Sequence, residues 1–198
     1  TGGRGLVFTS HFTAGAIPMI TYSDTQIVNN VVLSEGWAFF GSANPNQFRF
    51  ENASVSGNEF DGTVNSYNFF DSSISGNTIT GIAILGVEDS DVTGNTFNSE
   101  GYYALGLWGT DYGTNASNNS TISGNTFNYN VVGTTAPYDG GVAIRSGADA
   151  SSLTFDGNTF NDGGNDPSLE VSDLIWHGTS GNDVLDAGVI RDGSSNPV

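Results

Sequence analysis

Short segments in which apolar and polar residues alternate recur along the chain. The clearest is a phrase of six residues: Val, Ile or Phe, a small or polar residue, Gly, Asn, any residue, and Phe or Ile. Alternation with a period of two, bounded by turn residues, predicts short β-strands, and no segment shows a sustained helical period. The Asn of the phrase recurs as Asn58, Asn77, Asn95, Asn125 and Asn158, and a weaker copy places Asn30 in the same position.

The spacing of these Asn residues predicts a stacked repeat. Successive copies lie 28, 19, 18, 30 and 33 residues apart, which indicates one basic unit with loop insertions in the three longer intervals. One unit cannot bury its apolar face alone, so units must stack to make a core. Gly and Asn tolerate left-handed backbone geometry, so we expect each phrase to form the corner of a coil. The Asn amides would then form a ladder, and the apolar residues two positions later would stack inside the coil: Phe60, Ile79, Phe97, Phe127 and Phe160.

A second pattern, large–small–large, lies between the copies of the first. It occurs in segments 36–41, 66–71, 81–86, 102–107 and 141–146. Each is predicted to be a strand. Aligning the segments on the small residue places Ala38, Asn68, Ala83, Ala104 and Ala143 in one column. The same alignment places Arg145 where other segments have Phe40 and Leu85, which suggests that Arg145 points outward.

These patterns predict an all-β parallel β-helix, a solenoid with strands about 4.8 Å apart. The "SGNTF" phrases resemble the right-handed parallel β-helix proteins of bacteria and phages, which include pectate and alginate lyases, mannuronan epimerases, tailspikes and adhesins. The resemblance covers residues 20–165. It implies a right-handed helix of about 6–8 coils with loop insertions. We therefore expect a β-helix over residues 1–176 and a separate segment or linker over residues 177–198.

Composition and charge narrow the choice of partners. The chain has 21 acidic residues against 4 basic residues, all of them Arg, for a formal charge of −17. A DNA duplex or an anionic membrane needs a basic patch on its partner, so we expect neither as a partner. The longest apolar runs are too short to span a bilayer. The chain contains no Cys, shows no signal peptide and begins without Met, as expected for a processed protein or a piece of a longer one.

The segment 178–186, "GTSGNDVLD", fits one copy of a calcium-binding nonapeptide, with Thr in place of its second Gly. The resemblance implies that Gly178, Gly181 and Asp183 supply oxygen ligands and that calcium is the cofactor. The following residues give no clean second copy. A β-helix followed by this motif resembles the junction to the calcium repeats in secreted mannuronan epimerases. That resemblance implies an extracellular protein whose parent leaves the cell by type I secretion.

Two insertions carry the candidate site residues. Enzymes that act on uronic acid polymers need a cation for the sugar carboxylate and a base for the C5 proton. The family's Tyr-x-x-Asp-Pro-His-type motif is absent, as is Lys. The best local cluster is Tyr138, Asp139 and Arg145, in which Arg145 could hold a sugar carboxylate. The alternative is that Arg145 forms an ordinary surface salt bridge.

The other insertion, residues 107–120, contains Trp108, Asp111 and Tyr112. Its aromatic rings could form a platform for a sugar ring, with Asp111 bonding hydroxyls. The alternative is that Trp108 packs the loop onto the coil. The two histidines, His11 and His177, fit structural roles better than catalytic ones.

Two functions therefore remain open. One is a secreted module that acts on or binds acidic polysaccharide, similar to a mannuronan epimerase or alginate lyase, which leaves open whether the chain itself is an enzyme. The other is a structural or adhesive extracellular solenoid that self-associates through its coil ends, because exposed ends are open strand edges. A tailspike-like trimer fits less well, because a single calcium nonapeptide is not expected there.

Overall fold

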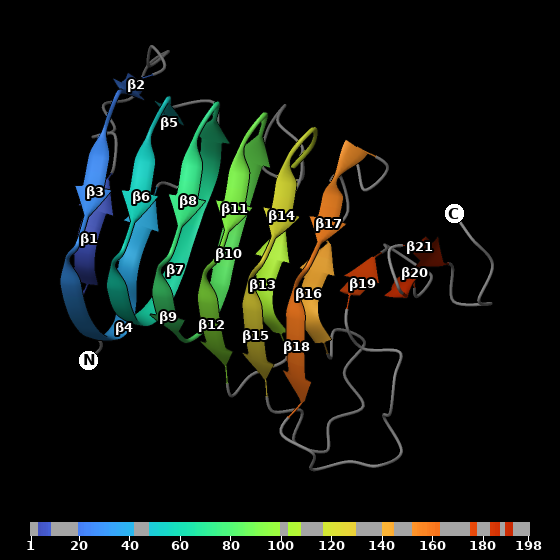
Figure 1. Ribbon diagram of the computed structural model, residues 1–198. Helices are drawn as coiled ribbons and strands as arrows, with labels where there is room; N and C mark the ends of the chain where they lie inside the picture. Colours follow the sequence, from blue (N-terminus) through green and yellow to red (C-terminus); the bar gives the residue numbers. More distant parts are fainter. Residues whose placement is uncertain are drawn as a thin grey trace, which may run out of the picture.

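The computed structural model describes residues 4–8, 20–41, 48–99, 103–107, 117–129, 140–144, 152–162, 175–177, 183–186 and 189–191. The described residues are built from β-strands and contain no α-helix, and Figure 1 shows the strands stacked side by side in chain order. The all-β prediction is confirmed, and the parallel stacks are compatible with a β-solenoid.

One sheet of six parallel strands forms the first face of the stack. Its order is β17-β14-β11-β8-β6-β3, and each strand contributes three residues. The strands are β3 (Gln26–Val28), β6 (Ser54–Ser56), β8 (Ser73–Ser75), β11 (Asp91–Thr93), β14 (Thr121–Ser123) and β17 (Thr154–Asp156). Every pair joins chain segments one repeat apart, which is the pattern that stacked coils require.

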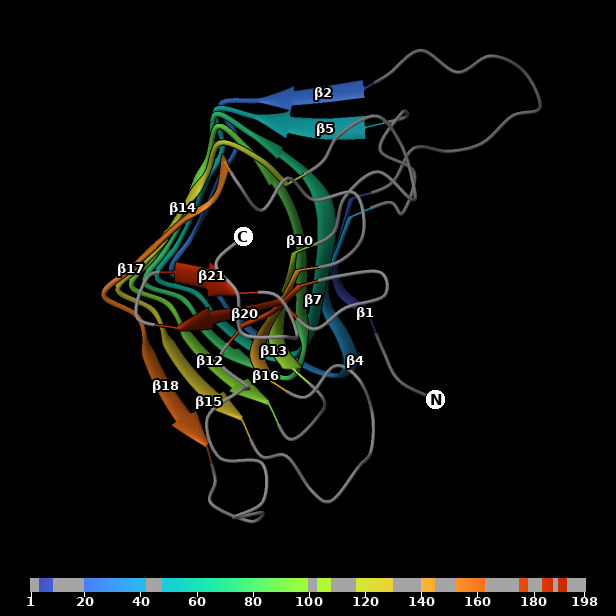
Figure 2. The ribbon, with the colours of Figure 1, turned by 90° about the vertical axis from the view of Figure 1, so that its right-hand side faces the viewer.

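A second, larger sheet bends around the rest of the stack, as the view along the stack shows (Figure 2). One arm follows the Asn corner and contains the first halves of β4 (Val31–Gly41) and β7 (Glu59–Phe70), then β9 (Thr78–Thr80), β12 (Thr96–Ser99), β15 (Thr126–Tyr129) and β18 (Thr159–Asp162). The other arm contains the second halves of β4 and β7, then β10 (Ala83–Glu88), β13 (Tyr103–Leu107), β16 (Gly140–Ile144) and β19 (Ile175–His177). We call one stacked repeat a rung.

Three further strands lie beside the first rungs. They are β1 (Arg4–Phe8), which pairs with β4, and β2 (Ile20–Ser23) and β5 (Phe48–Glu51), which pair with each other. At the other end of the sheet, β20 (Asp183–Asp186) and β21 (Val189–Arg191) continue from β19 by antiparallel pairing.

The Asn corner has the structure that the repeat predicts. Gly76, which precedes Asn77, has φ +62°, in the left-handed region that glycine adopts easily. The backbone N–H and the Nδ2 of Asn58 both donate to Oδ1 of Asn77, at 3.0 and 2.9 Å, and Nδ2 of Asn58 also donates to the carbonyl of Ile27. The same contacts recur through the six residues Asn30, Asn58, Asn77, Asn95, Asn125 and Asn158. The predicted amide ladder, including its weak first copy, is therefore confirmed.

The interior is a column of apolar side chains that follows this corner. The rings of Phe97 and Phe127 stack at 5.1 Å between centroids, and those of Phe127 and Phe160 stack at 5.0 Å. Phe60 and Ile79 continue the same register, and both are buried. This column was also predicted correctly from the phrase.

The alignment of the second pattern was wrong. The strand register places Phe39, Val64, Ala83, Leu105 and Val142 in one column instead of the five small residues. Register shifts in β4, and between β7 and β10, add or remove residues that period-two alternation cannot detect.

This register also changes the argument about Arg145. The residue in the column of Leu85 and Leu107 is Ile144, one position earlier. Leu85 is buried in the core, so its column gives no reason to expect an outward side chain.

Candidate functional site

The two predicted insertions join the sheet at neighbouring strands. The insertion around residues 130–140 lies between β15 and β16, so Tyr138 and Asp139 precede β16. Residues 108–116 follow β13, and residues 145–151, which begin with Arg145, follow β16. Leu107 and Ile144, the last residues of these strands, are direct register partners. The chain therefore departs toward Trp108 and toward Arg145 from adjacent rungs of one sheet arm.

Six of the predicted site residues are in or next to these insertions and lie outside the described residues: Trp108, Asp111, Tyr112, Tyr138, Asp139 and Arg145. Gly178 and Gly181 of the calcium motif also lie outside them. Asp183 begins β20, opposite His177 in the antiparallel pair. The structure thus relates the strand ends that precede Trp108 and Arg145 and leaves the roles of the eight residues as predictions.

The sheet arm that includes β13 and β16 contains a buried amide that the sequence did not single out. Val64 faces the core, so its neighbour Asn65 lies on the outer side of the strand, in register with Ile84 and Gly106. Asn65 is only 4% exposed, and its Oδ1 is buried without a hydrogen-bond partner. A buried polar atom of this kind costs about 1–3 kcal/mol.

Ser66, the next residue, presents a second unsatisfied atom on the inner side. It shares a register column with Leu85 and Leu107, is fully buried, and its Oγ has no hydrogen-bond partner. A ligand cannot reach a hydroxyl that is buried among Leu side chains in the core. We therefore regard Ser66 as a defect in core packing and not as part of a site.

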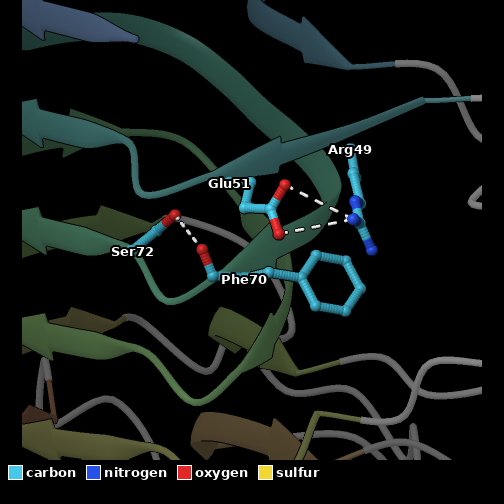
Figure 3. Close-up of polar contacts among 4 residues, drawn as sticks. All are labelled: Arg49, Glu51, Phe70 and Ser72. Atoms are coloured by element: carbon cyan, nitrogen blue, oxygen red, sulfur yellow. Dashed lines mark hydrogen bonds and ion pairs between the residues drawn. The ribbon is translucent and has the colours of Figure 1, made fainter. Parts of the chain in front are cut away.

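A polar cluster missed by the sequence analysis lies near the other corner of the coil (Figure 3). Arg49 Nη2 lies 3.3 Å from both carboxylate oxygens of Glu51, and the guanidinium lies 5.4 Å from the centroid of the Phe70 ring. Below them, Ser72 Oγ donates to the Phe70 carbonyl at 2.6 Å and accepts from the Ala53 N–H. The sequence does contain a signal for this cluster. Arg49 is one of only four Arg residues in the chain, and it stands two positions before the acid Glu51 in "FRFE".

This cluster has a structural explanation. The Arg49 and Glu51 side chains are 30% and 38% exposed, and an ion pair in that setting contributes about 1 kcal/mol or less. Glu88 lies in register with Phe70 on the next rung. Partial burial raises the pKa of Glu88, and the carboxylates of Asp89 and Asp71 raise it further, while Arg49 opposes them. The group holds one corner together, and Arg49 Nε is buried within it without a hydrogen-bond partner.

Neither a metal centre nor a membrane span is found among the described residues. Within those ranges, no three His, Asp or Glu side chains converge as metal ligands. No helix in the described part of the chain is long and apolar enough to cross a membrane.

Comparisons with known proteins assign no family. No family model matches the chain, and no curated protein and no solved structure is significantly similar to it.

Proposed function

We propose that this chain is a solenoid module that binds acidic polysaccharide on the outer face of β13 and β16. The observation that carries the proposal is the register pairing of Leu107 with Ile144. It places the strand ends that precede Trp108 and Arg145 side by side, which supports a site formed by aromatic and charged residues from two repeats.

Each candidate residue then has a distinct task. Trp108 and Tyr112 stack on a sugar ring, and Asp111 accepts hydrogen bonds from its hydroxyls. Arg145 pairs with a uronate carboxylate through a fork of two N–H groups. Tyr138 and Asp139 are the groups available to move a proton, which is what a mannuronan epimerase or an alginate lyase requires. The chain has no Lys and no Tyr-x-x-Asp-Pro-His-type motif, so proton transfer by this chain alone would depend on these two residues.

A cation is part of this proposal, because protein and ligand carry the same sign of charge. With 21 acidic and 4 basic residues, the chain repels a polyuronate at long range. The donor type at Gly178, Gly181 and Asp183, two carbonyls and one carboxylate, suits calcium. These three residues supply fewer than the 6–8 oxygens that calcium takes, so the remaining ligands must come from other residues or water.

We further propose that the coil is right-handed, with about 6–8 turns, because nearly all crossovers between parallel strands of one sheet have that hand. The resemblance of residues 178–186 to the calcium nonapeptide supports an extracellular location and type I secretion of the parent protein.

The test measures binding and turnover separately. The chain is titrated with polymannuronate and polyguluronate by calorimetry, with calcium and with chelator, and proton NMR follows double bonds and uronate composition. We expect calcium-dependent binding that weakens about tenfold or more in Arg145→Ala, since a charge-assisted hydrogen bond contributes about 1.5–3 kcal/mol.

Arg49→Ala is the matched control. It removes the same charge at the ion pair with Glu51 and should leave polyuronate affinity unchanged. No binding by the folded, calcium-loaded chain would refute the polysaccharide proposal, and equal losses in the two variants would refute the assignment to Arg145.

A structural solenoid is the second candidate, and the first rung supports it. Val31 and Leu33 lie on the outer side of β4 with 65% and 71% of their surface exposed, and β3 is an edge strand of the six-stranded sheet. An edge strand beside exposed apolar side chains is suited to pairing with another chain. Sedimentation analysis of the wild type and of Leu33→Lys tests this: self-association that the Lys variant does not reduce would exclude this edge as the contact.

A further inference from the structure

The outer face of β9, β12, β15 and β18 carries two continuous columns of small polar side chains. The first column contains Thr78, Thr96, Thr126 and Thr159. The second contains Thr80, Asn98, Asn128 and Asn161. Pairing is one-to-one through all four strands, without a register shift, and the intervening apolar residues point into the core. We call these two columns the Thr/Asn array.

The array is a preorganised lattice. Neighbouring strands are about 4.8 Å apart, and the two columns are separated by two residues, or about 6.6 Å. Asn128 Nδ2 donates to Asn98 Oδ1, and Asn161 Nδ2 donates to Asn128 Oδ1, both at 2.7 Å. These bonds fix the amide planes, and each amide nitrogen still has a second N–H. The Thr side chains are stiff because they branch at Cβ.

The array is also uncharged, which is unusual on a chain with a net charge of −17. The rung before the array is charged, because Glu59 and Asp61 occupy the same two columns there. The corresponding outer face of the six-stranded sheet includes Asp91 and Asp156. A partner that fits the array is therefore neutral and hydrogen-bonding, and it repeats along both directions of the lattice.

We propose that the Thr/Asn array binds the surface of ice. Oxygen atoms in hexagonal ice repeat at spacings close to those along and across the array, and each can donate or accept a hydrogen bond. A flexible polymer would lose conformational freedom on aligning with both columns, whereas ice is already ordered. Each contact is weak, and many identical contacts made together give a bound state that releases slowly. This inference does not depend on the polysaccharide proposal, because it uses a different sheet arm and no cation.

The experiment measures ice growth directly on the full chain. Single ice crystals are held in protein solution, and the gap between melting and freezing temperatures is recorded together with crystal shape. Thr126→Lys places a long charged side chain in the middle of the array. Thr121→Lys is the matched control, because Thr121 is equally half-buried on β14, on the other face of the same repeat.

We expect the wild type and Thr121→Lys to open a gap and to produce faceted crystals, and Thr126→Lys to lose both effects. Circular dichroism tests whether each variant is folded, and Thr96→Lys on the preceding rung replaces Thr126→Lys if that variant does not fold. A folded wild type without any effect on ice growth overturns the proposal. Equal activity in the two Lys variants overturns the assignment to the Thr/Asn array.

Discussion

Removing one amide from the middle of the Asn ladder should cost far more than removing one from the surface. Asn95 is 1% exposed. Its Oδ1 accepts from the N–H and from Nδ2 of Asn77, each at 2.9 Å, and its Nδ2 donates to the Ile74 carbonyl at 2.8 Å and to Asn125 Oδ1 at 3.0 Å. Asn95→Ala deletes these four hydrogen bonds and leaves their partners buried. At about 1 kcal/mol per bond, the free energy of unfolding should fall by about 4 kcal/mol.

Urea denaturation followed by tryptophan fluorescence measures this loss, and the melting temperature should fall by about 10 °C for a chain of this size. Asn161→Ala is the matched control. Asn161 is exposed, and its side chain donates a single hydrogen bond, to Asn128, so we expect a loss below about 1 kcal/mol. If the free energies of unfolding of the two variants differ by less than about 1 kcal/mol, the buried ladder is not what holds the rungs together.

Four other substitutions test separate parts of the fold by the same denaturation assay. A Cβ at Gly62, where φ is +138°, would lie 2.6 and 2.8 Å from the carbonyl oxygens of Ser34 and Gly36, so Gly62→Ala should be severely destabilising. Gly76→Ala meets no atom within 4 Å and should cost only about 1 kcal/mol for its left-handed backbone; equal losses in both would refute the steric argument. Ser66→Ala removes a buried hydroxyl without a partner and should stabilise by about 1 kcal/mol; a loss would show that the hydroxyl is satisfied. The pKa of Glu88 is raised in the folded chain, so the protonated carboxyl stabilises the fold relative to the carboxylate. This stabilisation is complete below the ordinary pKa of 4.5 and is lost as pH rises through the folded pKa. Glu88→Gln should therefore be more stable than the wild type at pH 7, with the advantage shrinking in acid, and a constant difference across pH would contradict this.

The parts of the fold that were predictable are those marked by residues with a special backbone or hydrogen-bonding property. Gly and Asn identify the corner for different reasons. Gly adopts its left-handed backbone, with positive φ, and the Asn that follows bonds the next rung through its side-chain amide. Once the corner is located, Phe97 and Phe127 must face inward by simple alternation.

The opposite sheet arm has no such marker. Its strands alternate apolar residues in a way that several registers satisfy, and the shift between Leu85 and Val87 is decided by packing with β7. The pairing of Leu107 with Ile144, on which the candidate site depends, therefore could not be read from the sequence. Asn65 was missed for a related reason: only the fold shows that its amide is buried without a partner.

The Asn ladder has one further property, which is its direction. In every rung the backbone N–H and the side-chain Nδ2 donate toward the following rung, from Asn30 through to Asn158. All the amide dipoles along this corner therefore point the same way, and bonds aligned in series polarise one another. Asn30 presents a carbonyl oxygen at one end, while Asn158 presents amide hydrogens at the other. The stack is thus electrically asymmetric along its axis, negative where the ladder begins and positive where it stops.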